Sequence, residues 1–217
     1  MLVIFFIMCY TTNAFAQTEQ EKDSVLTEMC NTVTTTTHMP DSNRRLNISL
    51  KHLLPFVNRF ERSTRKDLAN YLFFQLQKRC KEYRDLLRRL SKQRGDWEGL
   101  DEKPTTTLDK RACRNFLKHK EYFYREGNGD TVHLDLKHGR WVDHFKNGTH
   151  STLKLKWIDD CTFQIEFVES DNVSRKNFSK PGDKYNYEVL EKTEKYYSLV
   201  VWYENKGNFS KFKIYYR

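Results

Sequence analysis

The chain has 217 residues and a formal net charge of +9, which suits one large or two small domains. The basic excess is spread over both halves. Its one concentration is residues 63–94, with ten Lys or Arg and three Asp or Glu. We interpret this concentration as a solvated helix face that makes no more than a weak contact with an anionic surface. A nucleic-acid partner is therefore not expected.

The first sixteen residues are typical of a cleavable export signal. Leu2 to Met8 is an unbroken apolar run, and Ala14-Phe15-Ala16 fits the small-x-small pattern that signal peptidase reads. This predicts cleavage near Ala16. The run is too short to span a bilayer, which needs about 20 apolar residues. We expect a secreted or periplasmic protein and, because no later segment resembles a membrane span, not an integral membrane protein.

Four cysteines remain after cleavage, Cys30, Cys80, Cys113 and Cys161. An even number in an oxidising compartment predicts two disulfides, for which the sequence alone allows three pairings. We favour Cys30 with Cys80 and Cys113 with Cys161, because each half of the chain then links its own elements. No Cys-x-x-Cys occurs, which argues against a redox motif or a zinc ribbon.

The apolar spacing is helical up to residue 94. A first helix is predicted around residues 25–33 and a shorter one around residues 50–60, with a start or a kink near Pro55. The strongest prediction is a single long helix from Thr64 to Arg94. Residues 95–107 then lose the periodic pattern, so we interpret them as a linker between separable domains. This linker contains Gly95-Asp96-Trp97, a Gly-x-Trp match to lipocalins that we treat as chance.

From residue 118 onward the apolar period is two. Eight strands are predicted, at residues 119–125, 131–137, 140–146, 151–158, 161–168, 184–191, 195–204 and 209–216. Their short connections favour an antiparallel meander that closes into an up-and-down barrel. The alternative is an open, strongly curved sheet that packs on the N-terminal helices. The predicted class is α+β, with a signal peptide at 1–16, a helical domain at 17–94, a linker at 95–107 and a β domain at 108–217.

Two turns predict registers within the sheet. A two-residue turn at His138-Gly139 pairs His133 with His144. A three-residue loop that ends at Gly148, with this glycine in the left-handed region, places Trp141 opposite Leu153 on the apolar face.

Three segments resemble small secreted proteins that are common in Bacteroidota. They are Cys113-x-x-Phe116, Tyr122-Phe123-Tyr124 and Trp157 to Phe163, which has the form Trp-x-x-Asp-Cys-x-Phe. These proteins combine a signal peptide, a cysteine-bearing helical segment and a calycin-like, lipocalin-like C-terminal sheet. Some have been misnamed DNA topoisomerase IV, which an exported chain of this size cannot be. The resemblance covers residues 113–217 and implies a calycin-like β domain and the Cys113–Cys161 pairing, but no activity for any residue.

A metal site and an active site are both unexpected. In the predicted register His133 and His144 face one another with Asp135 on the same face, a set of groups that zinc can bind. We predict no metal there, because that face is solvated and nothing fixes the side-chain rotamers. The chain also lacks the Gly-x-Ser-x-Gly and His-Glu-x-x-His signatures. We therefore expect neither catalysis nor a cofactor.

The leading hypothesis is a non-catalytic exported binding module that holds a small apolar or amphipathic ligand in the β domain. The candidate ligand-binding residues are Trp141, Trp157, Phe163, Tyr187 and Trp202. The alternative is a secreted structural or interaction protein with a filled barrel, whose helical arm contacts a protein partner. An empty barrel interior would favour the first hypothesis, and an interior packed with aromatic side chains the second.

Overall fold

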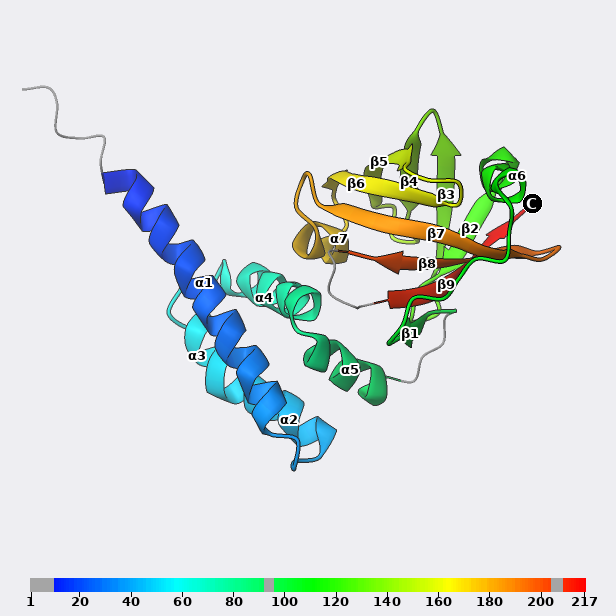
Figure 1. Cartoon of the computed structure of the whole chain (residues 1–217). Coiled ribbons are helices and arrows are strands. Elements are labelled where there is room, and N and C mark those ends of the chain that lie inside the picture. Colours follow the sequence, from blue (N-terminus) through cyan, green and yellow to red (C-terminus); the bar gives the residue numbers. More distant parts are fainter. Residues whose placement is uncertain (1–9, 92–95, 204–208) are drawn as a thin grey trace, which may run out of the picture. The chain divides into compact units, whose positions relative to one another are not determined.

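The computed structural model describes residues 10–91, 96–203 and 209–217, with side chains from residue 19 onward. It divides into two compact units, residues 1–91 and 92–217 (Figure 1). The first unit consists of helices and the second is built around one antiparallel sheet, so the predicted α+β class is confirmed. Residues 1–9 of the predicted signal peptide lie outside the described residues, and its cleavage stays a prediction.

The helical unit packs around one apolar core. Its elements are α1 Tyr10–Thr35, α2 Asp41–Ile48, the π-helical turn η1 Ser49–Leu53, α3 Leu54–Val57, α4 Arg65–Arg79 and α5 Lys81–Leu90. α2, η1 and α3 follow one another without a break in the helical backbone, so no new helix begins at Leu54; the π-helical turn η1 stands directly before Pro55, whose ring nitrogen has no hydrogen to donate to the preceding turn. The disulfide Cys30–Cys80, with an S–S distance of 2.11 Å, joins α1 to the end of α4, as predicted.

The single long helix predicted for residues 64–94 is wrong. It is broken at Cys80, whose backbone is extended, with φ −112° and ψ 107°. Arg84 compensates for the break, because its Nη1 donates to the carbonyl oxygens of Gln77 and Lys78 at the end of α4. These carbonyls are among those that a helix end leaves without backbone partners. Apolar periodicity continues across the break and therefore does not reveal it.

The sheet of the β unit closes into a barrel. Its strands are β1 Glu98–Leu100, β2 Tyr122–Arg125, β3 Thr131–Lys137, β4 Arg140–His144, β5 His150–Trp157, β6 Thr162–Ser170, β7 Lys184–Lys192, β8 Tyr196–Trp202 and β9 Phe209–Tyr216. Strands β2 to β9 pair in chain order, and β9 also pairs with β2. The eight-stranded meander is confirmed, and the open-sheet alternative is wrong. β2 begins at Tyr122 rather than residue 119, because the 3₁₀ turn η2 Asn115–Lys118 precedes it.

Both predicted registers are present. His133 pairs with His144 across β3 and β4, and Trp141 pairs with Leu153 across β4 and β5. The turns have the backbone that these registers need, with φ 54° at His138 and 81° at Gly148. Glycine suits the second position because it has no Cβ to clash in the left-handed region.

Residues 96–107 belong to the β unit and are not a free linker. β1 adds a ninth strand by pairing with β9, Glu98 opposite Lys211. Further along, the Thr107 amide donates to the Leu190 carbonyl oxygen at 3.1 Å. The prediction of a free linker was wrong because these residues are held by backbone hydrogen bonds and by the indole ring of Trp97, which stacks on Phe212. Neither kind of contact produces a periodic apolar pattern in the sequence.

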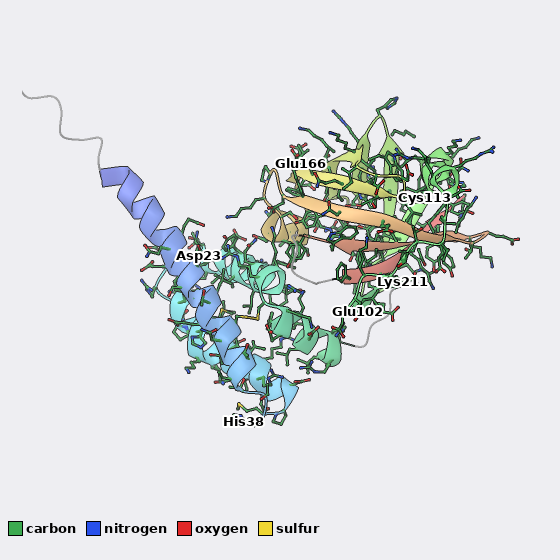
Figure 2. The ribbon with its side chains drawn as sticks, in the orientation of Figure 1. Asp23, His38, Glu102, Cys113, Glu166 and Lys211 are labelled. Carbon is green, nitrogen blue, oxygen red and sulfur yellow. A yellow bond between two sulfur atoms is a disulfide. The ribbon has the colours of Figure 1, made fainter. Side chains whose placement is uncertain are left out.

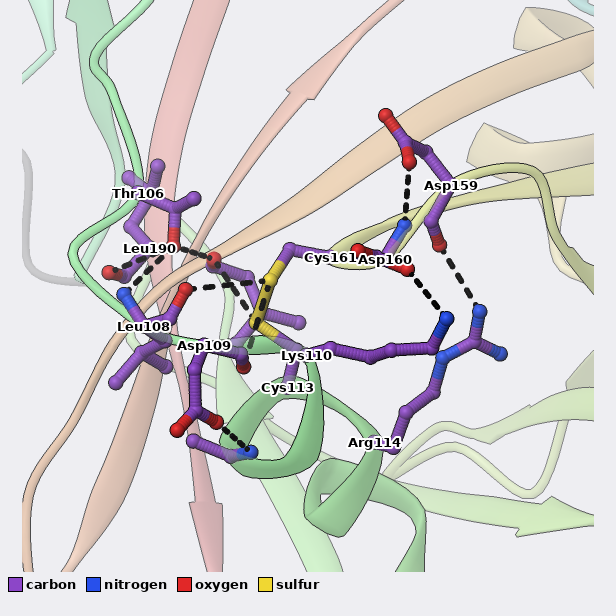
Figure 3. Close-up of a disulfide and its surroundings, with 12 residues drawn as sticks. Thr106, Leu108, Asp109, Lys110, Cys113, Arg114, Asp159, Asp160, Cys161 and Leu190 are labelled. Carbon is purple, nitrogen blue, oxygen red and sulfur yellow. Dashed lines mark hydrogen bonds and ion pairs between the residues drawn. A yellow bond between two sulfur atoms is a disulfide. The ribbon is translucent and has the colours of Figure 1, made fainter.

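A short helix and a disulfide close one end of the barrel. Helix α6 Lys110–Arg114 is capped by Asp109, whose carboxylate accepts from the Ala112 amide at 2.7 Å. The disulfide Cys113–Cys161, with an S–S distance of 2.03 Å, attaches α6 to the loop before β6, as predicted (Figure 3). This attachment places Phe116 of η2, which is fully buried, against the rings of Tyr122, Phe163 and Tyr197.

Aromatic rings pack on one another in the barrel interior, and most charged side chains of the strands lie outside. Phe163 stacks on Tyr187 with centroids 5.3 Å apart, and Tyr187 meets the edge of Phe212 at 6.0 Å. On the outer surface Glu166 pairs with Lys184 at 3.8 Å, and the labels of Figure 2 mark Glu166 and Lys211 on that surface. The alternation follows from the two-residue period of a strand.

Candidate ligand site at the open end of the barrel

A pocket of about 590 Å³ lies at the end of the barrel opposite α6. It is lined by the turn between β2 and β3, by the loop after β4 and by the first half of α7 Val173–Phe178. Most of these side chains are polar, including Glu126, Asp130, Lys146 and Arg175. Loops held by a rigid sheet are a common place for binding residues.

Asn172 positions α7 over the pocket. Its side-chain oxygen accepts from the amides of Ser174 and Arg175, at 3.1 and 3.3 Å, and so caps the helix. Its Nδ2 donates to the Thr149 hydroxyl at 2.9 Å, which ties the helix to the loop after β4. Arg175 is thereby held in the first turn of α7, facing the residues of β2.

A buried carboxylate adjoins the pocket. Asp143 is only 4% exposed, and its Oδ1 accepts from Trp141 Nε1 at 2.9 Å and from the Tyr124 hydroxyl at 3.1 Å. Burial raises the pKa of the Asp143 carboxyl, and the charge of Arg175 together with the two hydrogen bonds opposes only part of that effect. Burial likewise raises the pKa of Tyr124 well above its ordinary value, so this hydroxyl stays protonated.

Arg175 connects the buried carboxylate to the pocket. Its Nη2 donates to the Tyr124 hydroxyl at 3.1 Å and forms an ion pair with Glu126. Burial alone would lower the pKa of Arg175, but the charge of Glu126 raises it well above its ordinary value, so the guanidinium stays charged. Among the described residues neither Nε nor Nη1 of Arg175 has a hydrogen-bond partner. The pocket therefore offers a fixed cation with unused donors.

The structure brings together four of the five candidate residues, but as packing for one another, since Trp157 also meets the Phe163 ring edge-on at 5.2 Å. Trp141, Phe163 and Tyr187 are each less than 10% exposed. The Trp141 ring lies 6.1 Å from the Phe163 ring and 5.3 Å from the Tyr187 ring. Mutual contacts of this kind fill the space that a ligand would need. Their link to the pocket is indirect, through the hydrogen bond from Trp141 to Asp143.

Trp157 and Trp202 lie apart from Trp141 and Tyr187. Trp157 is at the α6 end, where the Arg114 guanidinium lies 4.2 Å from its ring centroid. Trp202 lies on the face of β8 opposite the interior residue Leu199, with Lys103 Nζ 4.8 Å from its ring centroid. The assignment of Trp202 to the interior was wrong, because its position in the strand has the outward parity.

The histidine set does not form a compact metal site. His144 Nε2 lies 3.2 Å from Asp135 Oδ2, and both side chains are about half exposed. Within the described part of the chain, the one compact set of metal-ligating atoms belongs to Cys30, Cys80 and Glu82, and both sulfurs are already in a disulfide. The predicted absence of a zinc site stays a prediction.

Sequence reasoning missed the residues of the network. Asp143 did carry a signal, since it shares the apolar face of β4 with Trp141, and a carboxylate at such a position is rarely buried without partners. Arg175 and Glu126 carried none, because they lie in a short helix and a turn without apolar periodicity. Their role depends on the closure of the barrel, which places β2 and α7 at the same end.

Comparison with family models, with curated proteins and with solved structures found no match for this chain. The resemblance to small secreted Bacteroidota proteins therefore stays a prediction. No helix in the described ranges is both long and apolar enough to cross a membrane.

Proposed function

We propose that this protein is an exported, non-catalytic binding module whose β unit takes a small ligand at the open end of the barrel. The observation that carries the proposal is the pocket of about 590 Å³ with Arg175 in its wall, fixed by Tyr124 and Glu126. Export is supported by the two disulfides, which persist in oxidising compartments.

Because aromatic rings pack on one another in the barrel interior, we expect a polar ligand in place of the apolar one expected from the sequence. An apolar molecule held among Trp141, Phe163 and Tyr187 would have to displace rings that already pack on one another. The side chains that line the pocket at the open end are mostly polar, with Phe145 and Val132 as apolar members. Its charged and amide groups suit a polar ligand that accepts hydrogen bonds, because unpaired polar groups are costly once water is excluded.

The experiment is native mass spectrometry of the protein purified from its source. Wild-type protein should retain a small molecule. Ser174→Trp should lose it, because Ser174 lines the pocket, is exposed and makes no side-chain hydrogen bond to any described residue, so that an indole there fills the pocket without disturbing the core. Lys176→Trp is the matched control, since Lys176 is exposed on the same helix but does not line the pocket. Retention by Ser174→Trp, or no retention by wild type, would refute the proposal.

A second candidate function is favoured by the filled interior and by exposed leucines in the helical unit. Leu46, Leu50 and Leu54 follow one another at every fourth residue and are 56%, 57% and 44% exposed. Such a row is typical of a surface that contacts a protein partner. In the same experiment this candidate predicts a retained protein chain that Leu50→Ser releases and Ser174→Trp does not.

A further inference from the structure

The helical unit carries a separate pocket of about 430 Å³ formed by residues of α2, α4 and α5 and the residue that follows α5. Three arginines, Arg45, Arg84 and Arg88, and three apolar side chains, Phe73, Leu87 and Leu90, account for most of its lining. The other lining residues are uncharged. Among the described residues, no carboxylate lines this pocket. It therefore combines positive charge with an apolar wall.

The three arginines are held to different degrees. Arg84 is fixed by the carbonyl oxygens of Gln77 and Lys78, as described above. Arg88 pairs with Asp85 at 3.1 Å, but Asp85 also has Lys81 as a partner at 2.8 Å. Arg45 is exposed, and its guanidinium has no hydrogen-bond or ion-pair partner in the described part of the chain. Arg45 and Arg88 can thus bind an anion without leaving a carboxylate unpaired.

The apolar wall is incompletely covered by the protein itself. Leu90 is 37% exposed. Phe73 is half-buried and meets the ring of Tyr83 edge-on at 6.2 Å, leaving part of its own ring uncovered. Covering these groups with an alkyl chain would remove apolar surface from water.

We propose that this pocket binds an acidic amphiphile as a single molecule. A phosphate or carboxylate head pairs with Arg45 and Arg88, and a short alkyl chain lies against Phe73 and Leu90. The argument is one of complementarity, since guanidinium groups bind such oxyanions strongly and in a fixed geometry. This site is independent of the ligand proposed for the barrel. For the basic segment 63–94, from which we expected only a weak contact with an anionic surface, it names one acidic amphiphile as the anion.

The test is calorimetric titration of the full chain with octyl phosphate. We expect saturable binding to one site. Arg45→Gln combined with Arg88→Gln should weaken it at least about tenfold, because two charge-assisted contacts are lost. The matched control, Lys51→Gln combined with Arg62→Gln, removes two exposed charges of the same unit that do not line the pocket and should bind like wild type. No binding to wild type, or equal loss in both double variants, would overturn the proposal.

A second comparison tests the apolar part. Methyl phosphate should bind more weakly than octyl phosphate, and Leu90→Ser should remove most of that difference. Leu90 is exposed, so this variant leaves the core of the helical unit intact. Equal affinity for the two phosphates would overturn the alkyl contact. Binding to phosphatidylglycerol vesicles without binding of octyl phosphate would assign the arginines to a membrane surface and would also overturn the proposal.

Discussion

The indole of Trp97 stacks on the ring of Phe212, with the two centroids 4.2 Å apart and the planes 4° from parallel. Its Nε1 also donates to the Arg125 carbonyl oxygen at 2.8 Å. Phe212 belongs to β9 and Arg125 to β2, the two strands that close the barrel; their ladder has two paired positions, and Glu121 and Arg217 exchange backbone hydrogen bonds beyond it. Trp97 thus bridges the closing seam of the barrel by packing on one strand and hydrogen bonding to the other.

Trp97→Ala should lower the free energy of unfolding of the β unit by about 3 kcal/mol, the usual cost of removing a large aromatic side chain from a packed site. Trp97→Phe should cost less, because it keeps a ring against Phe212 and loses only the hydrogen bond. Urea unfolding followed by circular dichroism measures both. An alanine variant as stable as wild type would show that the seam does not depend on this residue.

The β unit should need residues 96–107 in order to fold well. A fragment of residues 96–217 keeps Trp97, the pairing of β1 with β9 and the bond from Thr107 to Leu190. A fragment of residues 108–217 lacks all three, so its unfolding midpoint in urea should be lower. Both fragments keep the Cys113–Cys161 disulfide, which makes the comparison a matched one. Equal midpoints would restore the interpretation of this segment as a free linker.

The stability of the wild-type protein should carry a pH dependence that comes from Asp143. Burial raises the pKa of this carboxyl above the ordinary value of 3.8, so the native state binds its proton more tightly than the unfolded state does. The resulting stabilisation is present below the unfolded pKa and is lost as the pH rises through the raised native pKa. Asp143→Asn keeps a side-chain oxygen that can accept from Trp141 and Tyr124 but does not titrate.

The stability of Asp143→Asn relative to wild type should therefore increase as the pH rises above the ordinary carboxyl value of 3.8. Urea unfolding at several pH values measures the difference. A difference for Asp143→Asn that does not change with pH would contradict the raised pKa.

Non-reducing peptide mapping should recover Cys30 linked to Cys80 and Cys113 linked to Cys161. Replacing Cys113 and Cys161 together by serine should lower the stability of the β unit by about 3 kcal/mol, because a loop of this length becomes free in the unfolded chain. A disulfide between the two units, or four free thiols, would be inconsistent with the structure.

Local rules determined much of this protein from its sequence. The two-residue apolar period gave the eight strands of the meander, and the turns at His138-Gly139 and Gly148 gave two registers, because both depend on the backbone of neighbouring residues. One disulfide for each half followed from a different argument, that each half of the chain then links its own elements. Cys30 and Cys80 lie on apolar faces of neighbouring helices.

Tertiary structure decided the rest, because the deciding contacts join residues that are distant in the chain. Cys80, where the predicted long helix is broken, is bonded to Cys30, 50 residues earlier in the chain, and Trp97 packs on Phe212 of the last strand. Whether the barrel interior is empty depends on side-chain volumes, which fill it here with rings such as Phe163 and Tyr187. The candidate ligand site likewise exists only after closure of the barrel brings Arg175 to Tyr124. A periodic sequence pattern does not predict a contact between residues so far apart in the chain.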